Sequence, residues 1–203
     1  YLAWGDDLPV KIVRKERLFR SDVYEVQEGG TMQAFSADTT VQEEVLDRVQ
    51  SIFNESGIYN IKFVDTPSSD ATTVYFGQKP SDDANWELGG KAFDGIDVFN
   101  QSRSDRVAVF NVGNDVKLIA ETAAHELGHA FGLRHVNPSV EADPSNIAIM
   151  DYDYDINVDG RFINAISQIE TGVTTSLPTV LSHNPVYSLK RYIDGVSDDI
   201  LEQ

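Results

Sequence analysis

The chain has 203 residues, of which 41% are hydrophobic and 24% are charged, as in ordinary globular domains. Its 33 acidic residues outnumber its 16 basic ones, so the formal net charge is −17. This charge argues against binding to nucleic acid or anionic lipid, since both require a basic surface. No apolar run approaches the roughly 18 residues of a membrane span, and the lack of cysteine excludes disulfide bonds.

Strands and helices are predicted to alternate along the first two thirds of the chain. In chain order, the expected elements are a strand at 8–13, a break at Gly29-Gly30, a helix from Asp38 or Thr39 to Gly57, strands at 58–64, 72–76, 92–99 and 106–112, and a helix from Asn114 or Asp115 to about 127–131. The first helix is indicated by apolar residues that recur at helical spacing: Val41, Val45, Val49, Ile52 and Phe53. Such alternation is typical of a mixed α/β (α+β) domain.

The remainder of the chain is less regular, apart from a closing helix predicted over residues 185–196. At this length we expect a single domain, residues 1–203. The change in regularity suggests two lobes within it. The upper lobe would span about 1–135, and the lower lobe about 136–203.

One stretch reads H-E-x-x-H-x-x-G-x-x-H, in which the named positions are His125, Glu126, His129, Gly132 and His135. Two histidines four residues apart lie on one face of a helix, where both can reach one metal ion. The third would lie about 9 Å further along a continuing helix, so the helix must end and the chain must turn back. Glycine at 132 is the residue type that takes positive φ at least cost. This pattern predicts a zinc site with one open position, which is typical of catalytic rather than structural zinc.

At these residues the chain resembles the metzincin zinc endopeptidases. A second point of resemblance is Met150, fifteen residues after His135, because metzincins carry a methionine in a tight turn beneath the metal. Tyr152 follows two residues later, where the astacin-like and serralysin-like branches have a tyrosine that approaches the zinc. The residue after the third histidine, Val136, matches none of the commonest choices, so the branch stays open between matrixin-like, astacin-like and serralysin-like. The resemblance implies a two-lobe catalytic domain with a mixed twisted sheet.

The implied activity is hydrolysis of peptide bonds with Zn²⁺ held by His125, His129 and His135. Glu126 would act as the general base, and Tyr152 would stabilise the oxyanion. The alternatives are a binding or scaffold module that keeps the fold without turnover, and a zinc hydrolase of another amide. The intact Glu126 favours turnover.

A second metal signal lies at residues 155–160, which read D-x-N-x-D-G. Oxygen ligands at Asp155, Asn157 and Asp159 would suit Ca²⁺, as at the start of an EF-hand loop. Position twelve of such a loop is Ile166, where a bidentate glutamate is needed. A calcium site and an ordinary acidic turn both remain open.

The predicted partner is a peptide or protein substrate, bound extended along a sheet edge by β-augmentation. The resemblance places that edge strand before the second predicted helix, so residues 90–99 are the candidate. An enzyme of this type is expected to be secreted, and a pro-segment upstream is compatible with the sequence.

Overall fold

The structure is a computed structural model. It describes residues 1–15, 23–64, 66–79, 88–95, 104–110 and 115–135, together with residues 102, 149, 150, 162, 167, 168, 182, 183, 189 and 193. The described part is mixed α/β, with two helices and a mixed sheet. Neither of its helices has the length and apolar character needed to cross a membrane.

The main sheet contains four of the described strands, in the order β1-β4-β6-β5. Their bounds are β1 Leu2–Ala3, β4 Thr73–Gly77, β6 Arg106–Phe110 and β5 Gly90–Ala92. The first three run parallel, whereas β5 is antiparallel to β6. No described strand pairs with the outer edge of β5, so the predicted edge strand lies where it was expected, although it is shorter.

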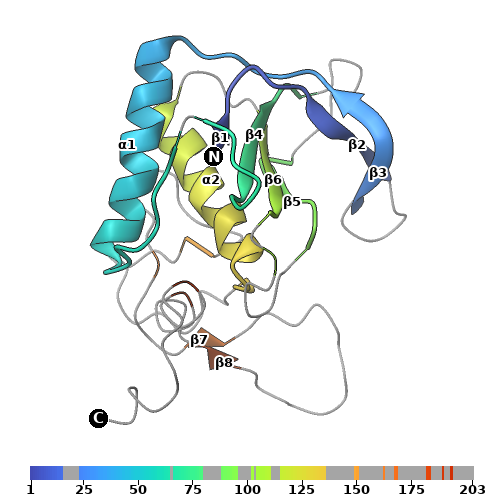
Figure 1. Cartoon of the computed structure of the whole chain (residues 1–203). Coiled ribbons are helices and arrows are strands. Elements are labelled where there is room, and N and C mark those ends of the chain that lie inside the picture. Colours follow the sequence, from blue (N-terminus) through green and yellow to red (C-terminus); the bar gives the residue numbers. More distant parts are fainter. Residues whose placement is uncertain are drawn as a thin grey trace, which may run out of the picture.

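Both faces of this sheet are covered, as the alternation along β6 shows. Val107 and Val109 pack into the core beneath the helices, while Ala108 and Phe110 belong to a second cluster beneath a β-hairpin. A central strand buried on both faces reads as a continuous apolar run, which explains the sequence of β6. Figure 1 shows the helices on one side of the sheet and the hairpin on the other.

Two helices, α1 (Thr39–Glu55) and α2 (Val116–Ala130), pack against one another, and α2 also contacts β5 and β6. Both predictions of where these helices begin are confirmed. The Asp38 carboxylate accepts from the backbone N–H of Val41, and the Asp115 carboxylate accepts from that of Leu118, at 3.0 Å each. Such caps satisfy backbone donors that lack a partner within the helix. The predicted stripe of α1 is buried at Val45, Val49, Ile52 and Phe53, and Gly57 ends the helix at φ 76°.

The hairpin consists of β2 (Leu8–Lys15) and β3 (Val23–Met32), which pair antiparallel. The predicted break at Gly29-Gly30 was wrong, because both glycines lie inside β3. A side chain at Gly30 would come within 2.5 Å of the Lys11 Cβ, so the glycine allows the two strands to approach each other. A register shift between Leu8 and Val10 accompanies it, and glycine inside a strand often marks such an irregularity.

Residues 58–64 do not form the predicted strand. Ile58 is buried, and Ile61 and Phe63 pack against the core, yet the segment has no strand ladder. Its apolar residues are therefore explained by packing alone. The strand predicted at 92–99 ends at Ala92, where a turn with Gly95 at φ 82° follows, and residues 96–99 lie outside the described part.

The predicted lower lobe lies largely outside the described residues. A short antiparallel pair, β7 (Ser167–Gln168) with β8 (Ser182–His183), belongs to it. Of the predicted closing helix, Leu189 and Ile193 are described, and both are helical and pack against the main core.

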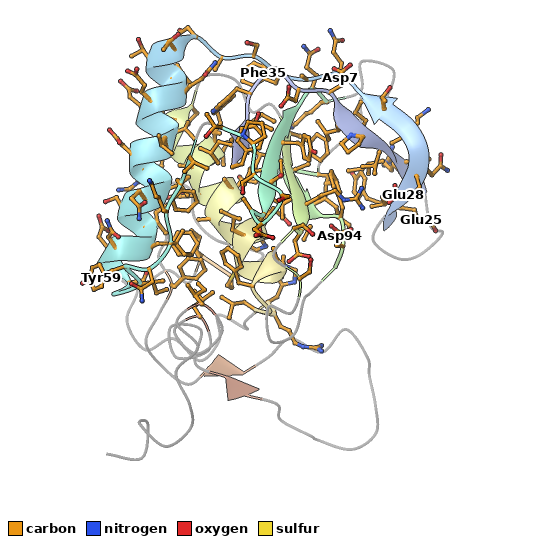
Figure 2. The ribbon with its side chains drawn as sticks, viewed as in Figure 1. Asp7, Glu25, Glu28, Phe35, Tyr59 and Asp94 are labelled. Atoms are coloured by element: carbon orange, nitrogen blue, oxygen red, sulfur yellow. The ribbon has the colours of Figure 1, made fainter. Side chains whose placement is uncertain are left out.

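Two side-chain contacts tie the upper part together. Trp4 stacks on Phe76 with ring centroids 3.6 Å apart and the planes within 1°. The Arg106 guanidinium donates to Asp94 at 2.7 Å and to Glu28 at 3.2 Å, and so joins the hairpin to the turn after β5. Figure 2 labels Asp94 and Glu28, the two residues that Arg106 joins, and the exposed Tyr59 near the end of α1.

Candidate metal site

The three histidines of the predicted site are brought together by the way in which α2 ends. The N–H of Leu133 donates to the carbonyl of Gly128, and the N–H of Gly132 donates to that of His129. This pair of hydrogen bonds, with Gly132 at φ 93°, is a Schellman motif. The predicted helix break at Gly132 is therefore confirmed, and the chain turns back so that His135 reaches the helix.

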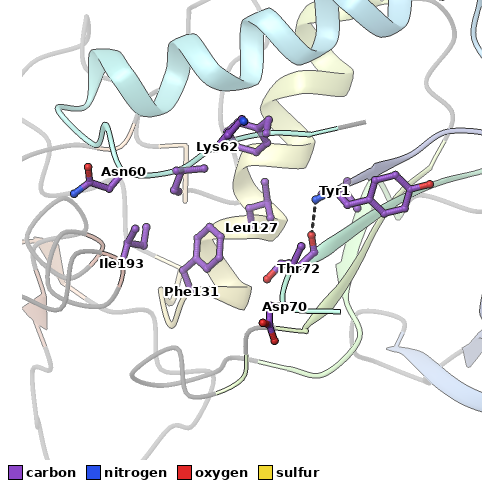
Figure 3. A pocket seen from close by; sticks show the side chains of 12 residues that line it. Tyr1, Asn60, Lys62, Asp70, Thr72, Leu127, Phe131 and Ile193 are labelled. Carbon is purple, nitrogen blue, oxygen red and sulfur yellow. Dashed lines mark hydrogen bonds between the residues drawn. The ribbon is translucent and has the colours of Figure 1, made fainter. Parts of the chain in front are cut away.

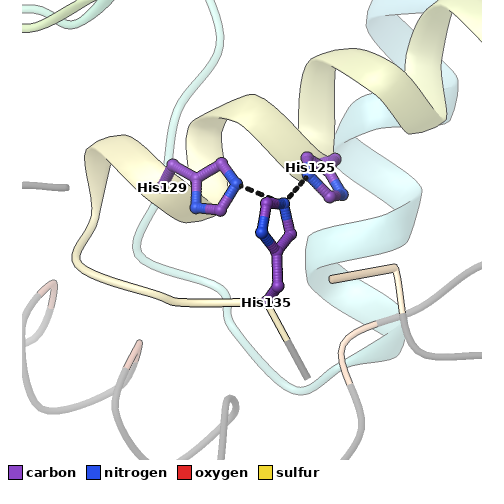
Figure 4. A group of neighbouring side chains, drawn as sticks. All are labelled: His125, His129 and His135. Carbon is purple, nitrogen blue, oxygen red and sulfur yellow. Dashed lines mark hydrogen bonds between the residues drawn. The ribbon is translucent and has the colours of Figure 1, made fainter. Parts of the chain in front are cut away.

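The three imidazoles converge through their Nε2 atoms, as Figure 4 shows. The Nε2 of His135 lies 3.1 Å from that of His125 and 2.9 Å from that of His129. Tetrahedral ligands at roughly 2.0–2.1 Å from zinc would be about 3.3 Å apart. The spacing of the nitrogens is thus close to that of ligands on one small ion.

The tautomers of two histidines follow from their other ring nitrogens. The Nδ1–H of His125 donates to the carbonyl of Ile149 at 2.6 Å, and the Nδ1–H of His129 donates to that of Leu133 at 2.8 Å. A carbonyl oxygen only accepts, so both Nε2 atoms carry lone pairs that face His135. One N–H on His135 cannot satisfy two acceptors well at once, whereas one cation can satisfy all three nitrogens.

The electrostatics of the cluster also favour neutral imidazoles, which are the form that binds metal. Burial, together with the neighbouring imidazoles, lowers the pKa of His129 and of His135 to about 3. Burial also lowers the pKa of His125. The triad can therefore hold a metal ion at neutral pH without first losing protons. Imidazole ligands alone suit several transition metals, so the donor set leaves the identity of the ion open.

Glu126 belongs to α2, and its side chain lies against the edge strand β5. It is only 7% exposed, and a side chain at Gly90 would come within 2.7 Å of its Oε1. Burial raises the pKa of Glu126 to about 8, while the charge of Lys91 and the backbone N–H of Ala92 both lower it. A carboxyl group with a raised pKa beside a cluster that can hold a metal ion is suited to take up and release a proton.

Met150 packs beneath α2 in a turn with Ile149. It is buried, and a Cβ built on Gly128 would lie 2.5 Å from its sulfur. The same turn supplies the carbonyl that orients His125. The predicted methionine thus lies in a turn against α2, where it contacts Gly128, which lies between His125 and His129 in sequence.

The other predicted site residues, Tyr152, Asp155, Asn157 and Asp159, lie outside the described part of the chain. Sequence reasoning missed the contributions of Gly90 and Gly128. The Gly89-Gly90 pair, at the start of the predicted edge strand, was the available signal that a backbone approaches closely there.

A cavity of about 220 Å³ lies against Leu127 and Phe131 of α2 and extends to Thr72 and Tyr1. Figure 3 shows the amino group of Tyr1 donating to the Thr72 carbonyl in its wall, at 2.9 Å. None of the three histidines lines it. The cavity and the histidine cluster are therefore separate features of the described part.

The described geometry defines a site that can hold a metal ion on three imidazoles beside a buried carboxyl group. In comparisons with known proteins, no family model and no curated protein match the chain.

Proposed function

We propose that this chain is a zinc-dependent endopeptidase of the metzincin type. The observation that carries the proposal is the convergence of three Nε2 atoms, two of them with lone pairs oriented by backbone carbonyls, beside the buried Glu126. Three protein nitrogens leave one position for a fourth ligand, which is the arrangement of catalytic zinc. The sequence resemblance and the position of Met150 support the same class.

When bound, zinc supplies Lewis acidity, which activates water and polarises a carbonyl group. In this proposal His125, His129 and His135 hold the ion, and the carbonyls of Ile149 and Leu133 keep two of the imidazoles oriented. The positive charge of an ion would lower the pKa of Glu126 from its metal-free value. Glu126 would then accept a proton from the attacking water at its carboxylate and deliver it to the leaving amine.

The edge strand β5 supports the proposal that the substrate is a peptide. Its outer edge is unpaired among the described strands, and its Gly90 backbone lies directly against Glu126. A peptide added along this edge would pass beside the proposed general base. Stabilisation of the oxyanion by Tyr152, calcium binding and secretion remain predictions from the sequence.

Metal analysis combined with a peptidase assay tests the proposal. The purified protein should contain one zinc per chain and should cleave an unstructured protein such as casein. Chelation of the metal should abolish cleavage, and addition of zinc should restore it. His129→Ala should lose both zinc and activity, whereas His183→Ala, a change at the remaining histidine, should keep them. Zinc without cleavage of any peptide or protein would favour a binding module or a hydrolase of another amide. Stoichiometric zinc in His129→Ala would contradict the site itself.

A further inference from the structure

Lys91 is the central residue of the edge strand β5, and both of its neighbours lie on the side of α2. Gly90 lies against Glu126, and Ala92 packs in the core beneath the helices. Side chains alternate along a strand, so Lys91 leaves the sheet on the opposite face. Its cross-strand partner, Ala108, belongs to the cluster on that same face, beneath the hairpin.

Two carboxylates on this face, those of Asp94 and Glu28, are already engaged. Arg106 lies two residues from Ala108 and therefore shares its face, and it binds the carboxylates of both Asp94 and Glu28. Lys91 itself is half-buried and forms no ion pair with any described residue.

Lys91 belongs to the strand along which the proposed substrate would lie, and its half-buried side chain leaves the sheet on the face described above.

We propose that Lys91 is a specificity-determining residue that selects peptide substrates with an acidic side chain at the position directly opposite it. This inference rests on the proposed function. A peptide paired with the outer edge of β5 places one residue across from Lys91, with its side chain on the same face of the extended sheet. Opposite charges at such cross-strand positions attract, and like charges repel.

The magnitude follows from the energy of cross-strand charge pairs. A pair of this kind corresponds to roughly a two- to fivefold difference in kcat/KM between a glutamate and a glutamine at the selected position. Glutamine is the appropriate reference, since it keeps the size and hydrogen bonding of glutamate and removes only the charge.

The test is competition between paired peptides in one reaction. Each pair differs only by Glu or Gln at one of the three positions on either side of the scissile bond, and the initial product ratio gives the ratio of kcat/KM. This ratio does not depend on the fraction of enzyme that carries metal, so a change in metal affinity cannot imitate the result. We expect one position to favour glutamate in the wild type.

Four variants complete the experiment. Lys91→Met should abolish the preference, Lys91→Glu should reverse it, and Lys91→Arg should retain it. Lys11→Met, on the exposed surface of β2, changes the net charge by the same amount and should leave the ratio unchanged.

Equal cleavage of glutamate and glutamine peptides at every position would overturn the inference while leaving the proposed function intact. So would equal shifts in Lys91→Met and Lys11→Met, because these would indicate only the overall field. Lys91→Met could instead alter the preference between peptides that end in a free carboxylate and the same peptides ending in an amide. In that case Lys91 binds the C-terminus of the substrate, and the inference is wrong. Failure to cleave any peptide would contradict the proposed function.

Discussion

The backbone of Gly90 lies against the side chain of Glu126. A methyl group on Gly90 would come within 2.6 Å of the Glu126 Cγ and 2.7 Å of its Oε1, which are distances that side-chain carbons do not adopt. The edge strand thus helps to determine where the proposed general base lies, although the strand and helix are separated by more than twenty residues in the sequence.

Gly90→Ala is therefore expected to displace the Glu126 carboxyl group while leaving the histidines in place. Peptide hydrolysis should fall by at least tenfold, since small misplacements of catalytic groups are costly, and the zinc content should remain at one per chain. Gly89→Ala is the matched control, because its added carbon would meet only the Thr122 side chain at 3.9 Å. Equal activity of the two variants would show that Glu126 can move without consequence.

Replacement of Glu126 by glutamine removes the proton acceptor and keeps the shape of the side chain. We expect stoichiometric zinc, an unchanged fold and a loss of about 10²–10⁴-fold in kcat. Single-turnover hydrolysis of a fluorogenic peptide would measure this loss. Activity within a few-fold of wild type would mean that another group transfers the proton.

The contact of Gly128 with Met150 is suited to a double-mutant cycle. Gly128→Ala places a carbon 2.5 Å from the Met150 sulfur, so overpacking should cost about 1–3 kcal/mol of stability. The better helix propensity of alanine should offset up to about 1 kcal/mol of this cost. In a Met150→Ala background the same change should be neutral or stabilising. Urea denaturation of the four proteins would give the coupling free energy, and a value near zero would contradict the packing described here.

The metal-free protein should lose stability in acid because of its histidines. Their folded pKa is about 3 for His129 and His135, below the ordinary 6.5, so the unfolded chain binds protons first as the pH falls. This contribution to the free energy of unfolding is complete above pH 6.5 and is lost as the pH falls toward 3.

Glu126 acts in the opposite direction in an overlapping range. Its raised folded pKa of about 8, compared with 4.5, makes its contribution complete below pH 4.5 and progressively lost as the pH rises toward 8. The histidine effect is therefore best measured in Glu126→Gln, by urea midpoints between pH 4 and pH 7.5 in the presence of a chelator. Adding His135→Gln should make the dependence shallower, and an unchanged slope would indicate that the imidazoles are already solvated.

The helices and the histidine cluster were predictable from sequence because their determinants are local. Asp38 and Asp115 cap their own helices, and Gly132 lies where the spacing of the histidines requires a turn. These features depend on residues within a few positions of one another, so they can be read without knowledge of the tertiary structure.

The errors concern backbone pairing, which depends on distant segments. Residues 58–64 have the apolar content of a strand but no ladder, and Gly29-Gly30 does not end β3, because the pairing with β2 resumes beyond a register shift. The role of Gly90 beside Glu126 also depends on the approach of a strand to a helix. Hydrophobic pattern records burial, but not the identity of the strand that lies alongside.

The stack of Trp4 on Phe76 provides the protein with an intrinsic fluorescence reporter. Trp86 is the other tryptophan of the chain, so a Trp86→Phe variant would emit from Trp4 alone. Its indole lies on a ring of the sheet core, and not on the metal ligands, so its emission reports whether that core is intact. In a chelator titration, activity that disappears while the emission stays constant would reveal a folded apoprotein, and a simultaneous red shift would reveal a protein whose sheet depends on its metal.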